Sequence, residues 1–348
     1  MDRAASRVGC GRGRRCWRPR RGGGSAGRGG AGKPVSSPLV TVIVRSLGRP
    51  QLSRALASVA AQSYPALEVV CVNARGPDHP ALAPATGRVP VRQVGGEGPL
   101  GRSRAANLGL AAAAGEFLAF LDDDDWFLEH HVATLMEALE AHPGVRAAYA
   151  DAEGVAEDGT VVHTFAQPFC HARLLVGNFI PIDAALFARS LLAEGCAFDE
   201  SLEVYEDWDF WLQLAERTPF VRVPRVGTRC ATDGGSGVGL NADPERQRVA
   251  RQRIYEKWRH HWSGERIDAL VRYLEEEVRA RDRLFLAAVA TAERATEELR
   301  RAGAEAANAR AALEGVLASR SWRWTAPLRR LKGAVAALGS PRTQREPS

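Results

Sequence analysis

Four consecutive aspartates, residues 122–125, are the clearest sign of chemistry in this sequence. Alternate residues of an extended segment point the same way, so Asp122 and Asp124 can face one ligand together. Clustered carboxylates repel one another and favour a bound cation. Hard divalent ions such as Mg²⁺ or Mn²⁺ take carboxylate oxygens and bridge them to phosphates. The run therefore predicts a metal or nucleotide site. The structural alternative is an acidic loop in which Asp125 caps the next helix.

A second acidic pair, Glu206 and Asp207, begins a predicted amphipathic helix over residues 205–217, with Trp208 and Trp211 on one face. Acids in the first turn of a helix are ordinary partners of its dipole. The pair is of interest because it supplies a carboxylate that is distant in sequence from the aspartate run. A general base that is separate from a metal site needs such a carboxylate.

A third segment opens a predicted Ala-rich helix and reads GRSRAAN over residues 101–107. Backbone N–H groups at the start of a helix and guanidinium groups both bind anions, so the segment suits a phosphate. The histidines do not suggest a metal cluster, because the adjacent pairs at 130–131 and 260–261 point to different sides of a helix.

Hydrophobic periodicity predicts the elements that position these residues. Buried strands are expected at 39–44, 67–72, 89–94 and 117–121, and helices at 50–62 and 101–114. This order indicates an α/β sandwich with a mostly parallel sheet. Ligands bind beyond the carboxyl ends of strands in such sheets, and the fourth strand runs directly into Asp122. The aspartate run is therefore expected where a site should lie.

The second half of the sequence is more mixed. Strands are expected at 145–149, 161–165, 220–223 and 226–228. Asp243 and Pro244 have the capping and first-turn signature of a helix that runs to about Trp262, where Ser263 and Gly264 interrupt it. We expect four regions: a disordered basic tail over 1–37, an α/β domain over 38–240, a helical extension over 241–318, and a basic Trp/Arg-rich tail over 319–348.

Composition limits the class of protein. The chain has 348 residues, of which 45% are hydrophobic and 25% charged, and this excludes a wholly disordered chain, a collagen and a multi-span membrane protein. The net charge of +6 is concentrated in residues 1–38, which hold nine Arg and one Lys against a single Asp. The basic character therefore belongs to a tail, which argues against a folded nucleic-acid-binding face.

The cysteines and the N-terminal sequence indicate the compartment. The six cysteines show no CxxC pair and no metal-ligand rhythm, so they predict reduced thiols in a cytosolic chain rather than a disulfide framework. The N-terminal sequence stays rich in Arg and Gly to Lys33 without an apolar stretch behind it, which does not fit a secretory signal. Localisation is expected to be cytoplasmic, with peripheral contact to the cytosolic face of the membrane.

A heptad pattern runs through residues 267–316. Steps of four and three connect fourteen apolar residues and one charged residue, Arg281. Such a pattern predicts a long helix with a coiled-coil seam. Many of the seam residues are alanine, so the seam is shallow. Pairing with a second copy, pairing with the body and a helix lying in solvent all stay open from sequence.

Three segments together resemble the inverting, metal-dependent family 2 glycosyltransferases of the GT-A fold. They are PLVTVIVRSLGRP with the following helix and strand, GRSRAANLGLAAAAGEFLAFLDDDDW, and FDESLEVYEDWDFW, and the resemblance covers about residues 38 to 235. The segment SRSWRWTAPLRRLKG at 319–333 resembles a tail seen on bacterial surface-polysaccharide glycosyltransferases. The resemblance implies an α/β GT-A domain followed by a long C-terminal helix.

The resemblance also implies roles for residues. The family's DxD motif falls on residues 122–124, which implies Asp124 as metal ligand for Mn²⁺ or Mg²⁺, with Asp122 and Asp123 holding metal and nucleotide. The ED motif falls on Glu206 and Asp207 and implies Asp207 as catalytic base. The remaining nucleotide-sugar contacts are expected from Ser46, Asn73, Arg104, Asn107 and Glu206.

The sequence departs from the family pattern at several positions. The pair after the first strand is Arg45-Ser46 where Pro-Thr is usual, and Asn73 stands where an Asp often holds the base. Ala106 replaces an Arg, and Arg104 is nearby. Cys230 and Asp233 occupy the region where some members have a late histidine.

The function expected from these residues is transfer of a sugar from a nucleotide-diphosphate donor to an acceptor hydroxyl, with inversion. The acceptor is expected to be a glycan or a lipid-linked molecule of bacterial cell-surface polysaccharide assembly. One alternative is a catalytically inactive GT-A scaffold protein that acts through its C-terminal helix. Another is a nucleic-acid-binding protein that works through the Arg/Gly tail. Residues 319–333 are expected either to contact an anionic membrane or to fold back on the body.

Overall fold

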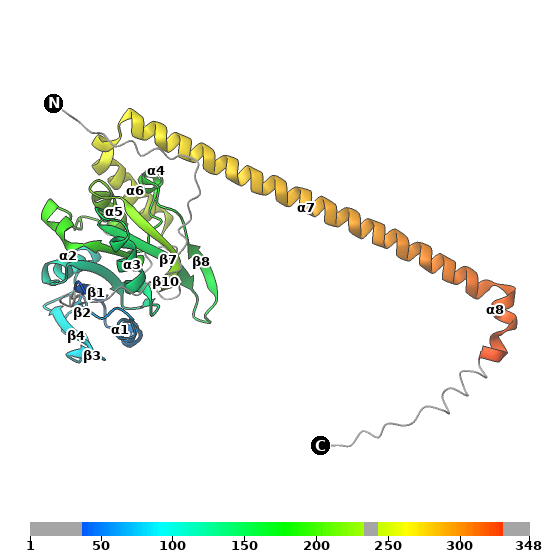
Figure 1. Ribbon diagram of the computed structural model, residues 1–348, viewed down its shortest axis with the longest axis horizontal. Helices are drawn as coiled ribbons and strands as arrows, with labels where there is room; N and C mark the ends of the chain where they lie inside the picture. The colour runs from blue at the N-terminus through cyan, green and yellow to red at the C-terminus, as the bar shows by residue number, and fades with distance from the viewer. Residues whose placement is uncertain (1–36, 203, 233–242, 330–348) are drawn as a thin grey trace, which may run out of the picture.

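The protein is described here by a computed structural model that places residues 37–202, 204–232 and 243–329 (Figure 1). A globular α/β body is followed by one very long helix. The body is built on a ten-stranded sheet whose main path runs β3-β4-β2-β1-β5-β9-β7-β10-β6, with β8 paired to β7. The expected basic tail over 1–37 lies almost wholly outside the described residues.

The first half of the sheet is parallel. β1 (Val40–Ser46) lies between β2 (Leu67–Asn73) and β5 (Phe117–Asp122), and β4 (Val89–Gly95) continues beyond β2. β3 (Ala85–Thr86) adds a short antiparallel edge. All seven residues of β1 are buried, as a β-branched run covered on both faces should be. The four strands predicted for this half are confirmed.

The second half of the sheet mixes directions. β9 (Ala185–Ala188) joins β5 to β7 (Ala147–Val155) with antiparallel pairing on both sides, and β10 (Phe220–Ala231) runs parallel to β7. β6 (Trp126–Phe127) pairs with β10, and β8 (Val161–Phe165) with β7. The two strands predicted at 220–223 and 226–228 are one strand, interrupted only by register shifts around Pro224, which cannot donate to the ladder.

Helices cover both faces of the sheet. α1 (Leu52–Ala60) and α3 (His131–Glu140) pack on the face that receives Val40, Val42 and Val44. α2 (Arg102–Ala112) and α5 (Glu206–Ala215) pack on the face that receives Ile43. Gly109 allows α2 to approach closely, since a Cβ there would lie 2.3 Å from Ile43 Cγ2. The predicted sandwich, with its mostly parallel core, is confirmed.

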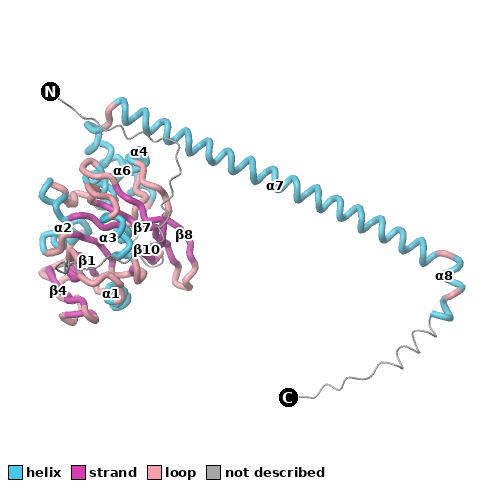
Figure 2. The backbone as a smooth tube through the Cα atoms, in the orientation of Figure 1, coloured by secondary structure: helices cyan, strands magenta, loops and turns pink. Residues whose placement is uncertain are grey.

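The C-terminal part is helical (Figure 2). α4 (His171–Val176) and α6 (Pro244–Trp258) lie on the body, and Asp243 caps α6 by accepting from Glu245 N–H. α7 spans Gly264–Ala318 and begins at Ser263, whose side chain accepts from Arg266 N–H, so the predicted interruption is confirmed. α8 (Arg320–Trp324) follows at its far end, and residues 330–348 of the predicted tail lie outside the described part. Within the described residues, no helix combines the length and apolarity needed to cross a bilayer.

Candidate active site

The parallel register of β1 and β5 aligns the ends of these strands. Arg45 pairs with Asp122, and Ser46 lies opposite Asn73 at the end of β2. Beyond these ends lies a cavity of about 680 Å³. Its lining includes residues from the β1 end, the aspartate run and the start of α5, among them Arg45, Ser46, Asp122, Asp124, Asp125, Glu206 and Asp207. The fold therefore brings the two acidic motifs to one cavity, with residues 122–125 at the end of β5 and Glu206 and Asp207 at the start of α5.

Two arginines and two acids form a buried network on one flank of the cavity. Arg45 donates from Nε and Nη2 to the two carboxylate oxygens of Asp122, at 2.7 and 2.9 Å, and from Nη1 to Glu206 at 3.0 Å. Arg102 donates to Glu206 at 2.8 Å and to Asp122 at 3.3 Å. Arg45 is only 7% exposed. This bidentate geometry fixes the orientation of Asp122.

Electrostatics within this network keep both acids ionised. Burial alone would raise the pKa of Asp122, but the guanidinium groups of Arg45 and Arg102 outweigh it and hold that pKa below its ordinary value. The pKa of Glu206 is lowered in the same way, by Arg102 and Arg45 against burial. Asp122 therefore shares its charge with two guanidinium groups before any metal is bound.

Asp123 is bonded to residues that line the cavity but does not line it itself. Its side chain is fully buried, and it accepts from Ser46 Oγ, from Leu47 N–H and from Arg49, whose Nη1 is 2.6 Å away. These bonds hold the turn between β1 and α1 against the end of β5. Ser46 Oγ also lies 2.8 Å from His79 Nε2. The geometry gives Asp123 a role in shaping the site, and it is not among the residues that line the cavity.

Two overlapping groups of carboxyls could hold a cation. The ligand atoms of Asp122, Asp124 and Asp125 lie within 4.8 Å of one another, and so do those of Asp125, Asp183 and Cys230. Asp183 comes from a turn of 3₁₀ helix that precedes β9, and Cys230 from the end of β10. Carboxylate oxygens are the ligands that Mn²⁺ and Mg²⁺ prefer, so the donor set fits a hard divalent ion.

Burial and mutual repulsion raise the pKa values of these acids. The pKa of Asp124 is raised by burial and by Asp122, and that of Asp125 is raised further by burial and by Asp183. Burial raises the pKa of Asp183 to about 6, although Thr228 and Cys230 donate to it. Asp125 accepts from Ala231 N–H at 2.8 Å. The negative charges of these three carboxylates are poorly compensated by the surrounding residues, and this favours the binding of a cation.

Asp207 is held in place on another wall of the cavity. Its Oδ2 accepts from Asn178 Nδ2 at 2.7 Å, and its Oδ1 accepts from Trp208 N–H at 2.8 Å. Asn178 Oδ1 accepts from Ile180 N–H, so the amide can present only its N–H groups to Asp207. Burial, followed by the charge of Glu206, raises the pKa of Asp207 to about 7. A carboxyl with this pKa is suited to take a proton near neutral pH.

The residue before this pair has an unusual backbone. Tyr205 has φ +62°, the only positive φ of a non-glycine residue in the described chain. Such conformations are costly and concentrate at functional sites. The ring of Tyr205 packs edge-on against Trp208, with centroids 5.6 Å apart. This turn directs the first residues of α5 towards the cavity.

Besides Asp123, three of the predicted contacts lie away from the cavity. Both polar atoms of Asn73 shape its own turn, since Oδ1 accepts from Arg75 and Gly76 N–H and Nδ2 donates to Gly76 O. Asn107 bonds to Phe198 backbone atoms through both ends of its amide. Arg104 is exposed on α2, whereas Arg102, one helical position from the cap, lines the cavity in its place.

Sequence reasoning missed Arg102, Asn178 and Asp183 as site residues. Arg102 lay within the segment that we singled out, and spacing alone did not separate it from Arg104. Asn178 and Asp183 flank residues 179–182, a short apolar run before β9, and that strand was not predicted, since periodicity does not distinguish so short a run from a helix. The four cysteines of the described residues are free, as expected.

Comparison with known proteins identifies the family. Residues 41–166 match the profile described as "Glycosyl transferase family 2". The chain is 26% identical over 238 residues to an uncharacterized protein, y4gI, of Sinorhizobium fredii, covering 64% of this chain and a quarter (25%) of that protein. It is 25% identical over 228 residues to an uncharacterized glycosyltransferase, YwdF, of Bacillus subtilis, covering 63% of this chain and 83% of the relative.

Further similarities are more distant. The O-antigen biosynthesis protein RfbC of Myxococcus xanthus is 28% identical over 189 residues, which cover 52% of this chain and 15% of RfbC. Among solved structures, mannosyltransferase PcManGT from Pyrobaculum calidifontis, in complex with GDP-Man and Mn²⁺, is 19% identical with a TM-score of 0.49 and 87% coverage of both chains. S. aureus TarS 1–349 is 18% identical with a TM-score of 0.46, covering 62% of this chain and 64% of that one.

The family profile covers β1 to β8, including the strand ends and the aspartate run on one side of the cavity, whereas Glu206 and Asp207 lie outside the matched residues. The similarity to YwdF extends over most of that glycosyltransferase. Residues 41–166, which make up much of the α/β body, therefore carry the sequence profile of glycosyltransferase family 2.

Proposed function

We propose that this protein transfers a sugar from a nucleotide-diphosphate donor to an acceptor hydroxyl with inversion, and that Asp207 is the base. The observation that carries the proposal is the arrangement of the cavity. A cation-compatible cluster at the end of β5 and a separate carboxyl with a pKa of about 7 line the same space. One displacement needs one base, which distinguishes this site from the two-carboxylate site of glycoside hydrolases.

Each step draws on residues of this chain. Asp207 takes the proton of the acceptor hydroxyl on a carboxylate oxygen, and Asn178 keeps that carboxylate oriented. The acceptor oxygen then forms a bond to the anomeric carbon while the bond to the diphosphate breaks on the opposite face. Arg102, at the cavity edge, supplies guanidinium N–H groups to the departing phosphate. A Mn²⁺ or Mg²⁺ ion held by Asp124, with Asp122 and Asp125, would neutralise charge on the diphosphate.

The acceptor class is proposed from context. The relative from Myxococcus xanthus is named for O-antigen biosynthesis, which suits a cell-surface glycan or lipid-linked acceptor. In the described part of residues 319–333, the side chain of Trp324 is 86% exposed. The guanidinium group of Arg329 stacks on the ring of Trp322, with Cζ 3.5 Å from the ring centre. Indole and guanidinium groups suit an anionic membrane surface. Truncation after Ser319 should reduce co-sedimentation with anionic vesicles and leave transfer to a water-soluble acceptor unchanged; equal vesicle binding would exclude this membrane role.

A thermal-shift screen tests the donor and the cation together. A nucleoside diphosphate at about 100 times its Kd stabilises the folded protein by about 2.7 kcal/mol. We expect stabilisation by one nucleoside diphosphate that depends on Mn²⁺ or Mg²⁺ and is lost in Asp124→Ala. Turnover of the matching nucleotide-sugar would then separate an enzyme from an inactive scaffold. Failure of all nucleoside diphosphates to stabilise the protein, with and without metal, would contradict the proposal.

A further inference from the structure

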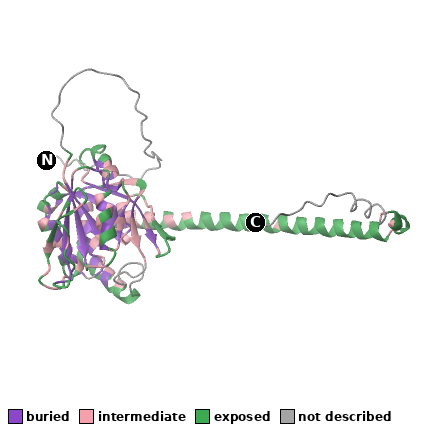
Figure 3. Ribbon diagram, turned by 90° about the horizontal axis from the view of Figure 1, so that it is seen from below, coloured by how far each residue is buried: buried purple, intermediate pink, exposed green. Residues whose placement is uncertain are grey.

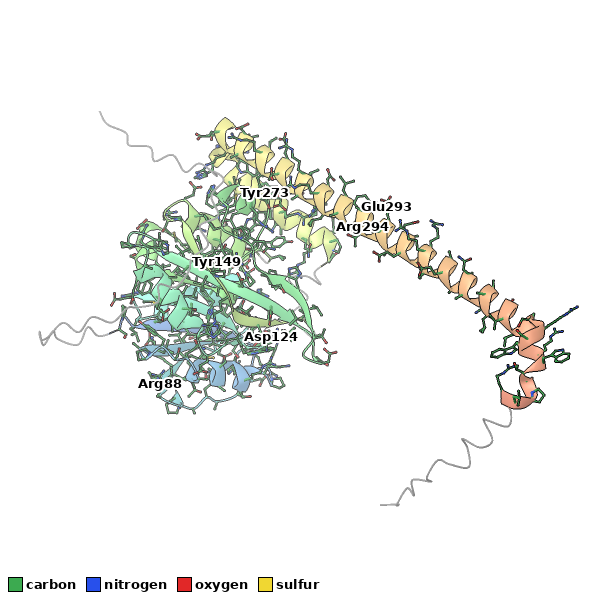
Figure 4. All side chains as sticks on the ribbon, turned by 45° about the vertical axis from the view of Figure 1, so that its right-hand side comes forward. Arg88, Asp124, Tyr149, Tyr273, Glu293 and Arg294 are labelled. Atoms are coloured by element: carbon green, nitrogen blue, oxygen red, sulfur yellow. The ribbon has the colours of Figure 1, made fainter. Side chains whose placement is uncertain are left out.

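The helix α7 extends far beyond the body. Its 55 residues correspond to a length of about 82 Å at 1.5 Å per residue. Figure 3 shows it as an exposed rod, and in Figure 4 Tyr273 lies where α7 meets the body while Glu293 and Arg294 lie well beyond it. No residue of α7 is buried. Helices in water are stabilised chiefly by packing of an apolar face, and here most of the helix packs on nothing within the described chain.

The two faces of α7 differ near the body. The half-buried positions Arg266, Leu270, Tyr273 and Glu277 recur at helical spacing on the side towards the body. Arg266 anchors this side through Glu216, at 2.8 Å. The apolar seam is on another face. Its exposed fractions are 45% for Ile267, 46% for Val271, 43% for Leu274, 58% for Val278 and 68% for Phe285.

We propose that the seam of α7 pairs with the α7 of a second copy of this chain, as a parallel two-stranded coiled coil. The seam keeps the heptad spacing without interruption from Ile267 to Val316, and the body leaves it uncovered. In heptad terms Val271 and Val278 occupy a positions and Leu274 the d position between them. A β-branched residue at a with leucine at d favours a parallel dimer.

Charges beside the seam suit the same arrangement. Arg281 occupies a d position and makes no ion pair within the described chain. In a parallel pair the two Arg281 side chains face each other, and Glu277 and Asp282, which flank the core at g and e, offset their positive charge. Further along, Glu305 at g faces Arg310 at e of the second copy. A charged residue at one core position fixes register and partner number at a cost in stability.

The acids beside the seam also favour a protein partner over a lipid surface. The positions that border it carry Asp268, Glu275, Glu277, Asp282, Glu298 and Glu305 against one basic residue, Arg310. Helices that lie on anionic membranes carry Lys and Arg beside their apolar face, the reverse of this pattern. A second copy, by contrast, offers an identical apolar seam.

The mass of the full-length chain in solution tests the pairing. Sedimentation equilibrium at micromolar concentration should give twice 37.6 kDa. Leu299→Glu at an a position should return the mass to that of one chain, because it places two like charges in the core beside Glu298, with no basic residue at the adjacent bordering positions to offset them. Leu286→Glu is the matched control, since Leu286 is also exposed on α7 (64%, against 75% for Leu299) but lies outside the seam.

The outcomes separate the alternatives. A monomeric wild-type chain overturns the proposal, and so does a dimer that Leu299→Glu leaves intact, because the interface would then lie elsewhere. Binding of wild type to anionic vesicles that Leu299→Glu abolishes, with a monomeric mass in solution, would assign the seam to lipid. Circular dichroism of both variants should show an unchanged body, so a monomer cannot be ascribed to unfolding.

Crosslinking tests the direction. In a parallel pair every d residue faces its own equivalent, so Ala288→Cys and Ala309→Cys, tested separately, should each form an intermolecular disulfide on mild oxidation. The wild-type chain, with its native cysteines, is the control. An antiparallel pair can bring at most one of these two positions next to its own equivalent, and crosslinking at only one of them would overturn the parallel arrangement.

Discussion

The two flanks of the cavity treat their carboxylates differently. On one flank Asp122 and Glu206 each accept from Arg45 and Arg102, and the pKa values of both acids are lowered. On the other, Asp183 and Asp207 accept only from neutral groups within the described chain, and their pKa values rise to about 6 and about 7. Asp124 lies between, 3.2 Å from Arg49.

This difference separates two tasks that acidic residues perform. A carboxylate that is already paired with arginine is fixed and ionised, and it shapes the site without being free to exchange protons. A carboxyl without an arginine partner can take a proton, and a bound metal ion stabilises its charge more than that of a carboxylate already paired with arginine. Substitutions on each flank test this division.

Replacing the base tests the unpaired flank most directly. Asp207→Asn should reduce turnover by about 10²–10⁴-fold, the usual contribution of general base catalysis. Because the amide is nearly isosteric, donor binding and the melting temperature should change little. Initial rates and donor titration measure the two effects separately. Turnover near that of wild type would remove Asp207 from the mechanism and would place the base elsewhere.

Breaking the paired flank should act on stability. Arg45→Met leaves Asp122 and Glu206 buried with one guanidinium group fewer, and the loss of one partner from a buried pair costs about 3–5 kcal/mol of unfolding free energy. Arg104→Met, on the exposed face of α2, is the control and should stay within about 0.5 kcal/mol. Urea denaturation measures both. Equal stability of the two variants would show that the network contributes no stability.

Removing a cluster carboxylate tests cation use. Asp124→Ala should reduce transfer by about 10²-fold or more, on the scale of losing a major electrostatic stabiliser, and EDTA should have a similar effect on wild type that Mn²⁺ reverses. Asp158→Ala, in the exposed turn between β7 and β8, is the control. Full activity of Asp124→Ala in the presence of EDTA would exclude the metal role.

Replacing Asn178, which donates to Asp207, should have a smaller effect than the three preceding substitutions. The wild-type rate should fall as pH drops below about 7, because Asp207 becomes protonated. Asn178→Ala removes an N–H group that stabilises the ionised form, so the pKa of Asp207 should rise by about one unit and the rate at pH 7 should fall about fivefold. The rate should recover at higher pH. A loss that is the same at every pH would instead indicate a purely structural role for Asn178.

The sequence predicted the parallel half of the fold best. Residues 39–44 and 117–121 are apolar runs that alternate with predicted helices, and this alternation identifies them as strands of a parallel sheet. β9 is not predicted, because a strand of four residues is too short to show a hydrophobic periodicity. It forms a strand only through its pairing with β5 and β7. The seam of α7 was visible as a pattern, but only the structure shows that the body covers a different face.

Sequence motifs predict part of the candidate site, and the contacts in the structure show which predicted residues line the cavity. Asp122, Asp124, Glu206 and Asp207 line the cavity because they follow a strand or begin a helix, and such positions can be read from sequence. Whether a polar side chain faces the cavity or bonds to nearby backbone depends on local turns. Asn73 therefore bonds to the backbone of its own turn and does not line the cavity. Arg45 is a departure from the family pattern, and its pairing with Asp122 became visible only when β1 and β5 were in register.

The length of α7 has a consequence for how the molecule moves through water. A body of about 220 residues has a radius of gyration of about 17 Å, so a rod of about 82 Å exceeds its diameter. Friction on such a shape is far larger than on a sphere of the same mass. A single chain will therefore elute from a gel-filtration column ahead of compact proteins of 37.6 kDa. Elution volume alone would mimic association, whereas sedimentation equilibrium reports mass independently of shape.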